Sequence, residues 1–151
     1  MTDHVSAVCQ SAAQSLYAMK LLKAHGMDSE SMYTVCRALV VSRLTYASPS
    51  WLGYASANHM QQIQAVLNRA RRWGFYKATD PNIDQLCAAR EQKLFKDILA
   101  NPSHVLHQFL PPPTTHAYNL RTRAHNRQLP AKNNALISKN SFPRLLYTSL
   151  Q

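Results

Sequence analysis

Apolar side chains recur at spacings of three and four residues along most of the chain before residue 110, with polar residues between them. This spacing places the apolar side chains on one face of an α-helix, because the helix turns once every 3.6 residues. Residues typical of helix ends divide the pattern into four helices. The predicted helices run from just after Asp3 to Gly26, from Asp28 or Ser29 to Pro49, from Ser56 to Gly74, and from Ile83 to Leu99.

The apolar positions of each predicted helix are expected to form the core of a helical bundle. In the first two helices they are Val5, Val8, Cys9, Ala12, Leu16, Met19 and Leu22, then Met32, Val35, Cys36, Leu39, Val40 and Leu44. In the last two they are Met60, Ile63, Val66, Leu67, Ala70 and Trp73, then Leu86, Cys87, Leu94, Phe95, Ile98 and Leu99. Trp51 is also expected to pack, because aromatic side chains beside helix ends usually do.

The helical pattern stops at three consecutive prolines, residues 111–113, because proline cannot continue a helix. A short turn or helix over residues 103–110 precedes them, and the compact part of the chain is expected to end there. Residues 114–151 carry few apolar side chains before 142–147, which predicts a mostly irregular arm with one anchoring element. We therefore expect an all-α protein with a small helical bundle over 1–77, a helical segment over 78–110 packed on it, and a basic C-terminal arm over 111–151.

The chain is strongly basic, with 17 Lys and Arg against 7 Asp and Glu, a formal charge of +10 and a pI of about 9.9. The last acidic residue is Asp97, so the predicted arm has only neutral and basic residues. A positive charge of this size favours an anionic partner such as nucleic acid.

The three cysteines, Cys9, Cys36 and Cys87, lie far apart in the sequence. An odd number without paired spacing fits the reduced thiols of the cytoplasm or nucleus better than a disulfide framework. No stretch approaches the roughly 18 to 20 apolar residues that span a bilayer, and the first residues lack the layout of a signal peptide. We therefore expect an intracellular protein, in the cytoplasm or nucleus, that has no membrane partner.

The third predicted helix turns a basic, amide-rich face away from the core. The residues opposite its apolar stripe are Gln61, Asn68, Arg69 and Arg72. Guanidinium groups bind phosphates through paired hydrogen bonds, and amides reach sugars or base edges. Arg69 and Arg72 are therefore predicted to bind a nucleic-acid backbone, and Lys77 beyond the helix is a further candidate. The alternative interpretation is a solvated face whose arginines stabilise the carboxyl end of the helix dipole.

The predicted arm supplies a second set of basic residues, Arg121, Arg123 and Arg127, close to the aromatic Tyr118. Such a segment grips a phosphate backbone or stacks on unpaired bases. Binding of this kind depends on counterion release, so it weakens with salt and does not read sequence. The alternative is a tail that packs loosely on the domain through Tyr118 and Leu120.

The sequence gives no grounds for an autonomous enzyme. Its acidic residues are scattered, and it has neither the Asp-Asp pair that holds metals in polymerases nor a nucleophile motif. Three glycines form no phosphate-binding loop. His104 and His107 are three residues apart, but the second close pair that a zinc site needs is missing. No metal and no cofactor is expected.

Two stretches, residues 44–51 and 63–72, resemble the thumb region just downstream of the polymerase core in reverse transcriptases of non-LTR, LINE-like retrotransposons. The residues that carry the resemblance are Tyr46, Pro49, Trp51, Gln64, Asn68, Arg69 and Ala70. Residues 15–26 are similar to the preceding helix of the family, and residues 94–147 contain motifs similar to those of its C-terminal region. The resemblance covers essentially the whole chain.

The resemblance implies a C-terminal fragment of an RNA-directed DNA polymerase that lacks the catalytic palm and the endonuclease. Such a thumb is a helical bundle that lies along the primer–template duplex, so Arg69, Arg71 and Arg72 are expected to contact the backbone of an RNA–DNA hybrid or duplex. They would position nucleic acid and would not catalyse.

Three alternatives remain open at the level of sequence. The first is a small helical nucleic-acid-binding adaptor. The second is a protein-interaction module that associates with itself through the surface that would face a palm, around Leu16, Tyr17, Trp51 and Leu52. The third is a remnant of the element without a function.

Overall fold

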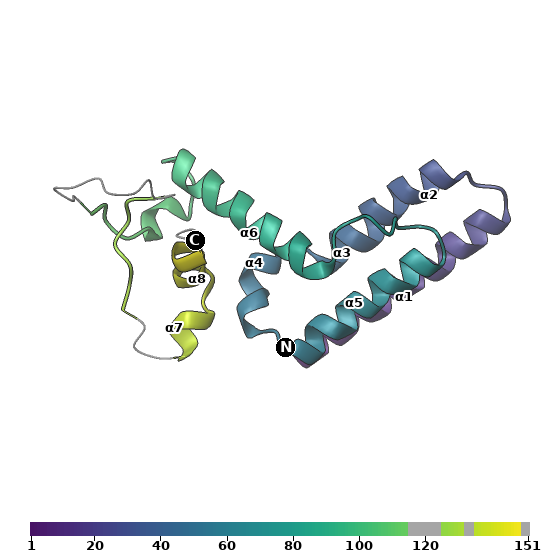
Figure 1. Cartoon of the computed structure of the whole chain (residues 1–151), viewed down its shortest axis with the longest axis horizontal. Coiled ribbons are helices and arrows are strands. Elements are labelled where there is room, and N and C mark those ends of the chain that lie inside the picture. Colours follow the sequence, from purple (N-terminus) through teal and green to yellow (C-terminus); the bar gives the residue numbers. More distant parts are fainter. Residues whose placement is uncertain (115–124, 132–134, 149–151) are drawn as a thin grey trace. The chain divides into compact units, whose positions relative to one another are not determined.

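The computed structural model describes residues 1–114, 125–131 and 135–148 and confirms the all-α class (Figure 1). The helices are α1 (Thr2–Ala24), α2 (Ser29–Val35), the π-helix η1 (Cys36–Val41), α3 (Ser42–Leu44), α4 (Ser48–Trp51), the 3-10 helix η2 (Leu52–Tyr54), α5 (Ala57–Arg72), α6 (Ile83–Ala100), the 3-10 helix η3 (His107–Phe109), α7 (Ala135–Lys139) and α8 (Ser141–Thr148). Extended pairing in the described residues is limited to an isolated bridge between Pro113 and Arg127.

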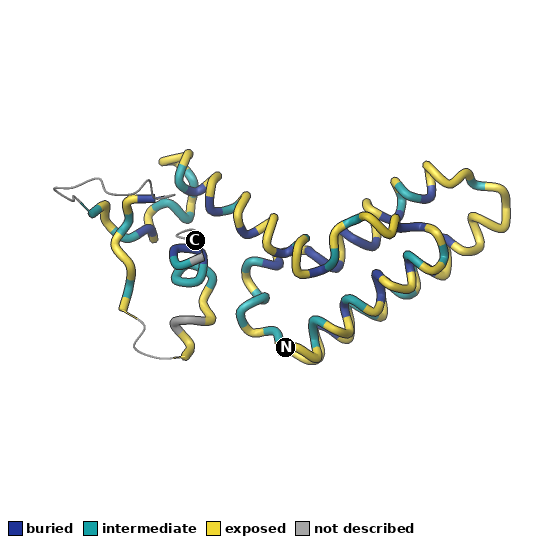
Figure 2. The backbone as a smooth tube through the Cα atoms, in the orientation of Figure 1, coloured by how far each residue is buried: buried dark blue, intermediate teal, exposed yellow. Residues whose placement is uncertain are grey.

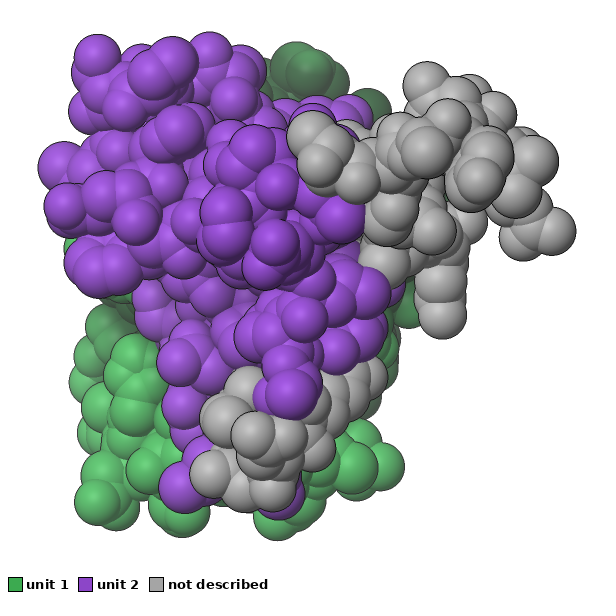
Figure 3. Space-filling model, turned by 90° about the vertical axis from the view of Figure 1, so that its left-hand side faces the viewer, with its two compact units in different colours: residues 1–48, 55–87 green, residues 49–54, 88–151 purple. Residues whose placement is uncertain are grey.

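The chain forms two compact units (Figure 3). The first, unit 1, contains residues 1–48 and 55–87, and the second, unit 2, contains residues 49–54 and 88–151. These boundaries differ from those predicted at residues 77 and 110. The reason is that α6 is one continuous helix whose beginning belongs to unit 1 and whose remainder belongs to unit 2.

Helices α1 and α5 lie side by side and form the centre of unit 1 (Figure 1). Their buried side chains are Val5, Ala12, Leu16 and Met19 of α1 and Ile63, Val66, Leu67 and Ala70 of α5, and Figure 2 shows these buried positions recurring along both helices. The contacts at both ends show that the two helices run parallel. Thr2 Oγ1 lies 3.4 Å from His59 Nε2 near their beginnings, and Lys23 Nζ donates to the Trp73 carbonyl at their ends. Leu22, expected in the core, is exposed, because it lies about a quarter turn away from the buried stripe of α1.

The predicted second helix is interrupted by the π-helix η1. The predicted helix begins where expected, because the Asp28 side chain caps α2 by accepting hydrogen bonds from the backbone N–H groups of Glu30 and Ser31. Leu39, expected in the core, is 47% exposed, and Val41 is buried instead. A π-helix forms i to i+5 hydrogen bonds and holds more residues in each turn than an α-helix. The buried face therefore shifts along η1 relative to the α-helical expectation.

Ala47, just after α3, has a φ of +49°. This left-handed conformation is unfavourable for any residue with a Cβ. We expect Ala47→Gly to raise the free energy of unfolding by about 0.5–1 kcal/mol, measured by urea denaturation. Ala65→Gly, at an exposed position in α5, is the control and should lower it by about 1 kcal/mol. A loss of stability in both variants would contradict the prediction.

The core of unit 2 joins α6 to the C-terminal arm. Phe95 and Ile98 of α6 pack with Leu110 and with Leu145 and Leu146 of α8. The expectation that the compact part of the chain ends before the prolines is therefore wrong. The anchoring element expected over 142–147 is present as α8. Its packing on α6 was not predicted, because the two pairs of apolar residues are separated by about 50 positions, outside any helical window.

His125 fixes the arm within this core. Its Nε2 donates a hydrogen bond to the backbone oxygen of Leu146 at 2.9 Å, and its Nδ1 accepts one from the backbone N–H of Arg127 at 3.1 Å. The ring also meets Phe95 edge to face, with centroids 5.5 Å apart. A carbonyl only accepts and an amide N–H only donates, so these partners select the neutral ring with its proton on Nε2.

A largely buried ion pair connects α6 with α8. Glu91 is 8% exposed and accepts a hydrogen bond from Arg144 Nε at 3.0 Å, while Arg144 Nη2 pairs with the same carboxylate oxygen. The guanidinium also donates to the backbone oxygens of Lys139 and Pro49, at 3.0 and 3.1 Å. Arg144 thus connects four segments of unit 2.

Candidate nucleic-acid interface

Arg69 and Arg72 lie on the exposed side of α5, in its last turn. They point away from the buried stripe formed by Ile63, Val66, Leu67 and Ala70. Neither side chain has a hydrogen-bond or ion-pair partner within the part of the chain that the structure describes. The predicted basic face is therefore present, and both guanidinium groups are available to a ligand.

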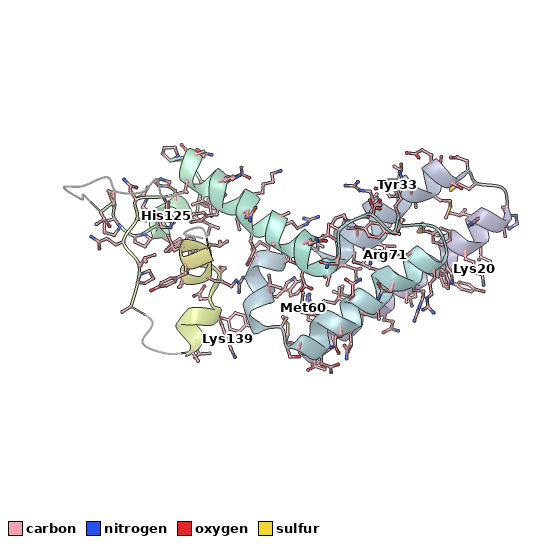
Figure 4. All side chains as sticks on the ribbon, viewed as in Figure 1. Lys20, Tyr33, Met60, Arg71, His125 and Lys139 are labelled. Carbon is pink, nitrogen blue, oxygen red and sulfur yellow. The ribbon has the colours of Figure 1, made fainter. Side chains whose placement is uncertain are left out.

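Arg71 is differently placed (labelled in Figure 4). It is half-buried, and its guanidinium donates to Asn68 Oδ1 at 3.2 Å and to the backbone oxygen of Asp80 at 2.8 Å. It also lies 5.4 Å from the centroid of the Tyr76 ring. A phosphate would have to compete with these groups for Arg71, so its main role in the fold is to hold the loop that follows α5.

The amides of α5 belong to the same network. Gln64 donates to Asn68 Oδ1 at 2.8 Å and accepts a hydrogen bond from the backbone N–H of Ile83 at 2.9 Å. Asn68, predicted to reach toward nucleic acid, therefore has two intramolecular donors on its oxygen. Helical periodicity predicts the face on which Asn68 lies, but it contains no information on the contacts that the residues before α6 make with this face.

Lys77 is exposed, and its ammonium lies 4.5 Å from the centroid of the Tyr33 ring. The Tyr33 hydroxyl donates to Asp80 Oδ1 at 3.1 Å, and Asp80 Oδ2 accepts from the backbone N–H of Lys77 at 2.9 Å. Arg37 donates to the same hydroxyl at 3.2 Å. The carboxylate of Asp80 reduces the positive field at this corner, which makes Lys77 a weaker candidate for phosphate binding than Arg69 and Arg72.

Helix α1 supplies two cations that the sequence analysis did not include, Lys20 (labelled in Figure 4) and Lys23. The Lys20 ammonium lies 5.7 Å from the centroid of the Trp73 ring, and Lys23 donates a hydrogen bond to the backbone oxygen of Trp73 at 3.2 Å. Since Trp73 directly follows Arg72, both lysines are brought to the end of α5. We call Lys20, Lys23, Arg69 and Arg72 the basic end of unit 1.

The predicted binding residues of the arm divide into two groups. Tyr118, Arg121 and Arg123 lie outside the described residues. Arg127 is half-buried, donates to the backbone oxygen of Pro111 at 3.2 Å, and forms the bridge with Pro113. Arg127 therefore helps to fix the course of the arm, a role that its sequence context did not indicate.

The exposed apolar surface of unit 1 differs from the expected one. Leu16 is buried between helices and only Tyr17 of the predicted set is exposed, at 61%, whereas Trp51 and Leu52 of unit 2 are half-buried. The core position predicted for Leu16 is confirmed, because it lies at the centre of the buried stripe of α1, and its inclusion in the predicted contact surface is wrong. The exposed apolar residues also include Leu21 and Tyr46, the latter 75% exposed at a groove of about 340 Å³ beside η1.

The three cysteines are thiols with different accessibility. Cys36 and Cys87 are buried and Cys9 is half-buried. Burial, with a smaller contribution from the charge of Asp80, raises the pKa of the Cys36 thiol to about 11, and burial also raises the pKa of Cys9. The thiolate is the reactive form, so neither Cys9 nor Cys36 resembles an activated nucleophile.

We expect a thiol reagent such as dithionitrobenzoate to label Cys9 in the native chain and to label Cys36 and Cys87 only when the chain unfolds. Burial blocks access, and the raised pKa of Cys36 lowers its thiolate fraction at pH 8. Counting modified thiols against time, with and without urea, checks this. Rapid labelling of two or three thiols without urea would contradict it.

The described residues contain no group of three or more His, Cys, Asp or Glu side chains arranged to hold a metal ion. Among residues 1–114, 125–131 and 135–148, no helix is both long enough and apolar enough to cross a bilayer. Comparisons of the chain with protein-family models, with curated proteins and with solved structures found no match.

Proposed function

We propose that unit 1 is a thumb-like helical module that binds the sugar–phosphate backbone of an RNA–DNA hybrid or duplex without reading its sequence. The observation that carries the proposal is the basic end of unit 1. There Arg69 and Arg72 have no partner in the described residues, and the parallel packing of α1 and α5 brings Lys20 and Lys23 to the same end. Four cations on a rigid pair of helices suit a repeating phosphate backbone.

The physical basis of this binding is electrostatic. The net charge of +10 attracts polyanions over a long range, and each neutralised phosphate releases condensed counterions. Guanidinium groups bind phosphate oxygens in pairs, whereas ammonium groups act as point charges. Arg69 and Arg72 therefore fix the position of the backbone, and the two lysines add affinity.

We infer further that the chain corresponds to the C-terminal thumb region of an RNA-directed DNA polymerase of a non-LTR retrotransposon, without the catalytic palm. This inference rests on the sequence resemblance. It is supported by the placement of the motif residues Gln64, Asn68, Arg69 and Ala70 on one helix, α5. In this role the chain works inside the cell, positions nucleic acid and carries no polymerase activity of its own.

A sequence-independent interaction makes a direct test possible. The dissociation constant of the chain should be measured by gel shift for two RNA–DNA hybrids of equal length and unrelated sequence, and for a DNA duplex. We expect the two hybrids to agree within about twofold, because phosphate contacts carry no sequence information. A preference of tenfold or more for one hybrid sequence, or no binding to either, would overturn the proposal.

A protein-interaction role is the second candidate, and it is favoured by the exposed aromatic side chains Tyr17 and Tyr46. A contiguous exposed apolar patch marks a contact site between proteins, and Tyr46 and Leu39 line the same groove beside η1. A second copy of the chain is the partner that this candidate names. Sedimentation velocity over a range of protein concentrations, without nucleic acid, distinguishes the two. A monomer at all concentrations rejects the second candidate, and a dimer that Tyr46→Ser disrupts supports it.

A further inference from the structure

We propose that Trp73 is a stacking site for an unpaired nucleotide next to the basic end of unit 1, with its base on the indole ring and its phosphate on the surrounding cations. The inference rests on the proposed function and adds a ligand class to it. A module that only contacts a duplex backbone does not need an aromatic surface. A module that also binds an unpaired strand end needs an aromatic surface on which the base stacks.

The structure fixes the position of the Trp73 ring from several sides. The backbone N–H of Trp73 caps α5 by donating a hydrogen bond to the Arg69 carbonyl at 3.1 Å. The Trp73 carbonyl accepts a hydrogen bond from Lys23. The ring meets Phe75 edge to face, with centroids 6.1 Å apart and planes at 73°. Phe75 is 1% exposed, so Trp73 rests against the core while remaining only half-buried itself. A ring held in this way loses little conformational entropy when a ligand stacks on it.

The cations around the ring select the charge of the ligand. Lys20 lies over the Trp73 ring, 5.7 Å from its centroid, and Lys23 lies 5.6 Å from the centroid of the Phe75 ring. Arg69 precedes Trp73 by about one helical turn, and Arg72 directly precedes it. This much positive charge repels the quaternary ammonium ligands that aromatic cages bind, and it attracts an anion that has a flat face. A nucleotide has both features.

Stacking on Trp73 also favours unpaired bases over bases inside a duplex. Each base within a duplex already stacks on its neighbours, so its faces are not accessible to a side chain. Every unpaired base presents a π face, and stacking on aromatic side chains tolerates all four bases. The Lys20 contact is weak at an exposed site, so a base displaces the ammonium from the ring and the ammonium then meets the phosphate. The preferred ligand is therefore a duplex end with a short single-stranded extension.

The test compares one RNA–DNA hybrid with blunt ends against the same hybrid with a three-nucleotide single-stranded extension. Trp51→Phe leaves Trp73 as the sole indole, so its fluorescence reports on this site alone. We expect the extended hybrid to bind about tenfold more tightly, since stacking strengthens binding by roughly that factor per base, and to quench the Trp73 emission. Equal affinities, or binding without quenching, would overturn the inference and leave the proposed function standing.

Two variants separate stacking from packing. Trp73→Leu keeps an apolar side chain but removes the π face, and it should reduce the ratio of the two affinities from about ten to about one. Trp73→Tyr retains a π face and should keep most of the preference. If Trp73→Leu does not fold, as judged by circular dichroism, the affinities of the Trp51→Phe chain for the blunt and extended hybrids still test whether Trp73 binds an unpaired base. Failure of both hybrids to bind would overturn the proposed function as well.

Discussion

Arg144→Ala is expected to lower the free energy of unfolding by about 3 kcal/mol, the lower end of the range observed when one partner of a buried ion pair is removed, because the Arg144 side chain is still 19% exposed. The substitution leaves the carboxylate of Glu91, whose side chain is 11% exposed, without its cation. It also removes the donors to the backbone oxygens of Lys139 and Pro49. Urea denaturation followed by far-ultraviolet circular dichroism measures the effect.

Arg90→Ala is the matched control, because Arg90 precedes Glu91 on α6 and is exposed. It should change the free energy of unfolding by less than about 0.5 kcal/mol. The double variant Glu91→Ala, Arg144→Ala should lose less free energy of unfolding than the sum of the losses of Glu91→Ala and Arg144→Ala measured singly. The reason is that the double variant leaves neither charge without its partner. Equal losses for Arg144→Ala and Arg90→Ala would show that the ion pair does not stabilise unit 2.

Arg69→Ala combined with Arg72→Ala is expected to weaken binding to an RNA–DNA hybrid by about 10- to 100-fold at 0.1 M salt, as the loss of two phosphate contacts predicts. Arg71 is left unchanged, because its guanidinium holds the loop before α6 and its removal would confuse binding with folding. The melting temperature of the variant should stay within a few degrees of that of the natural chain. Fluorescence anisotropy with a labelled hybrid measures the affinity.

Lys93→Ala combined with Lys96→Ala provides the control of equal charge. Both lysines are exposed on α6 and lie outside unit 1. This variant loses the same net charge, and we expect an effect of less than about threefold, because long-range attraction is screened at this salt concentration. If the two double variants weaken binding equally, the interaction depends on total charge and not on the basic end of unit 1.

The sequence predicted the local features of the fold well. Asp28 and Ser56 cap their helices, and Gly26 and Gly74, with φ of +92° and +76°, follow the ends of α1 and α5. Capping and helix termination depend on a few neighbouring residues, so they can be inferred from short windows. The exposed position of Arg69 and Arg72 followed from helical periodicity in the same way.

Features that depend on distant parts of the chain were not predictable. The approach of Lys20 to Trp73 requires that α1 and α5 pack in parallel, and the contacts of Arg71 require the loop before α6 to fold back. The π-helix η1 changed the buried face between Leu39 and Val41, and periodicity at 3.6 residues per turn cannot detect such a change. Pairing between helices is a tertiary property that cannot be inferred from periodicity within short windows of the sequence.

The salt dependence of hybrid binding tests the central claim most directly. The dissociation constant of the natural chain should be measured by fluorescence anisotropy from 25 to 300 mM salt. Four phosphate contacts, one for each cation of the basic end of unit 1, predict a slope of about −3 to −4 in a plot of the logarithm of the association constant against that of the salt concentration. No binding at 25 mM salt, or a slope near zero, would contradict the account.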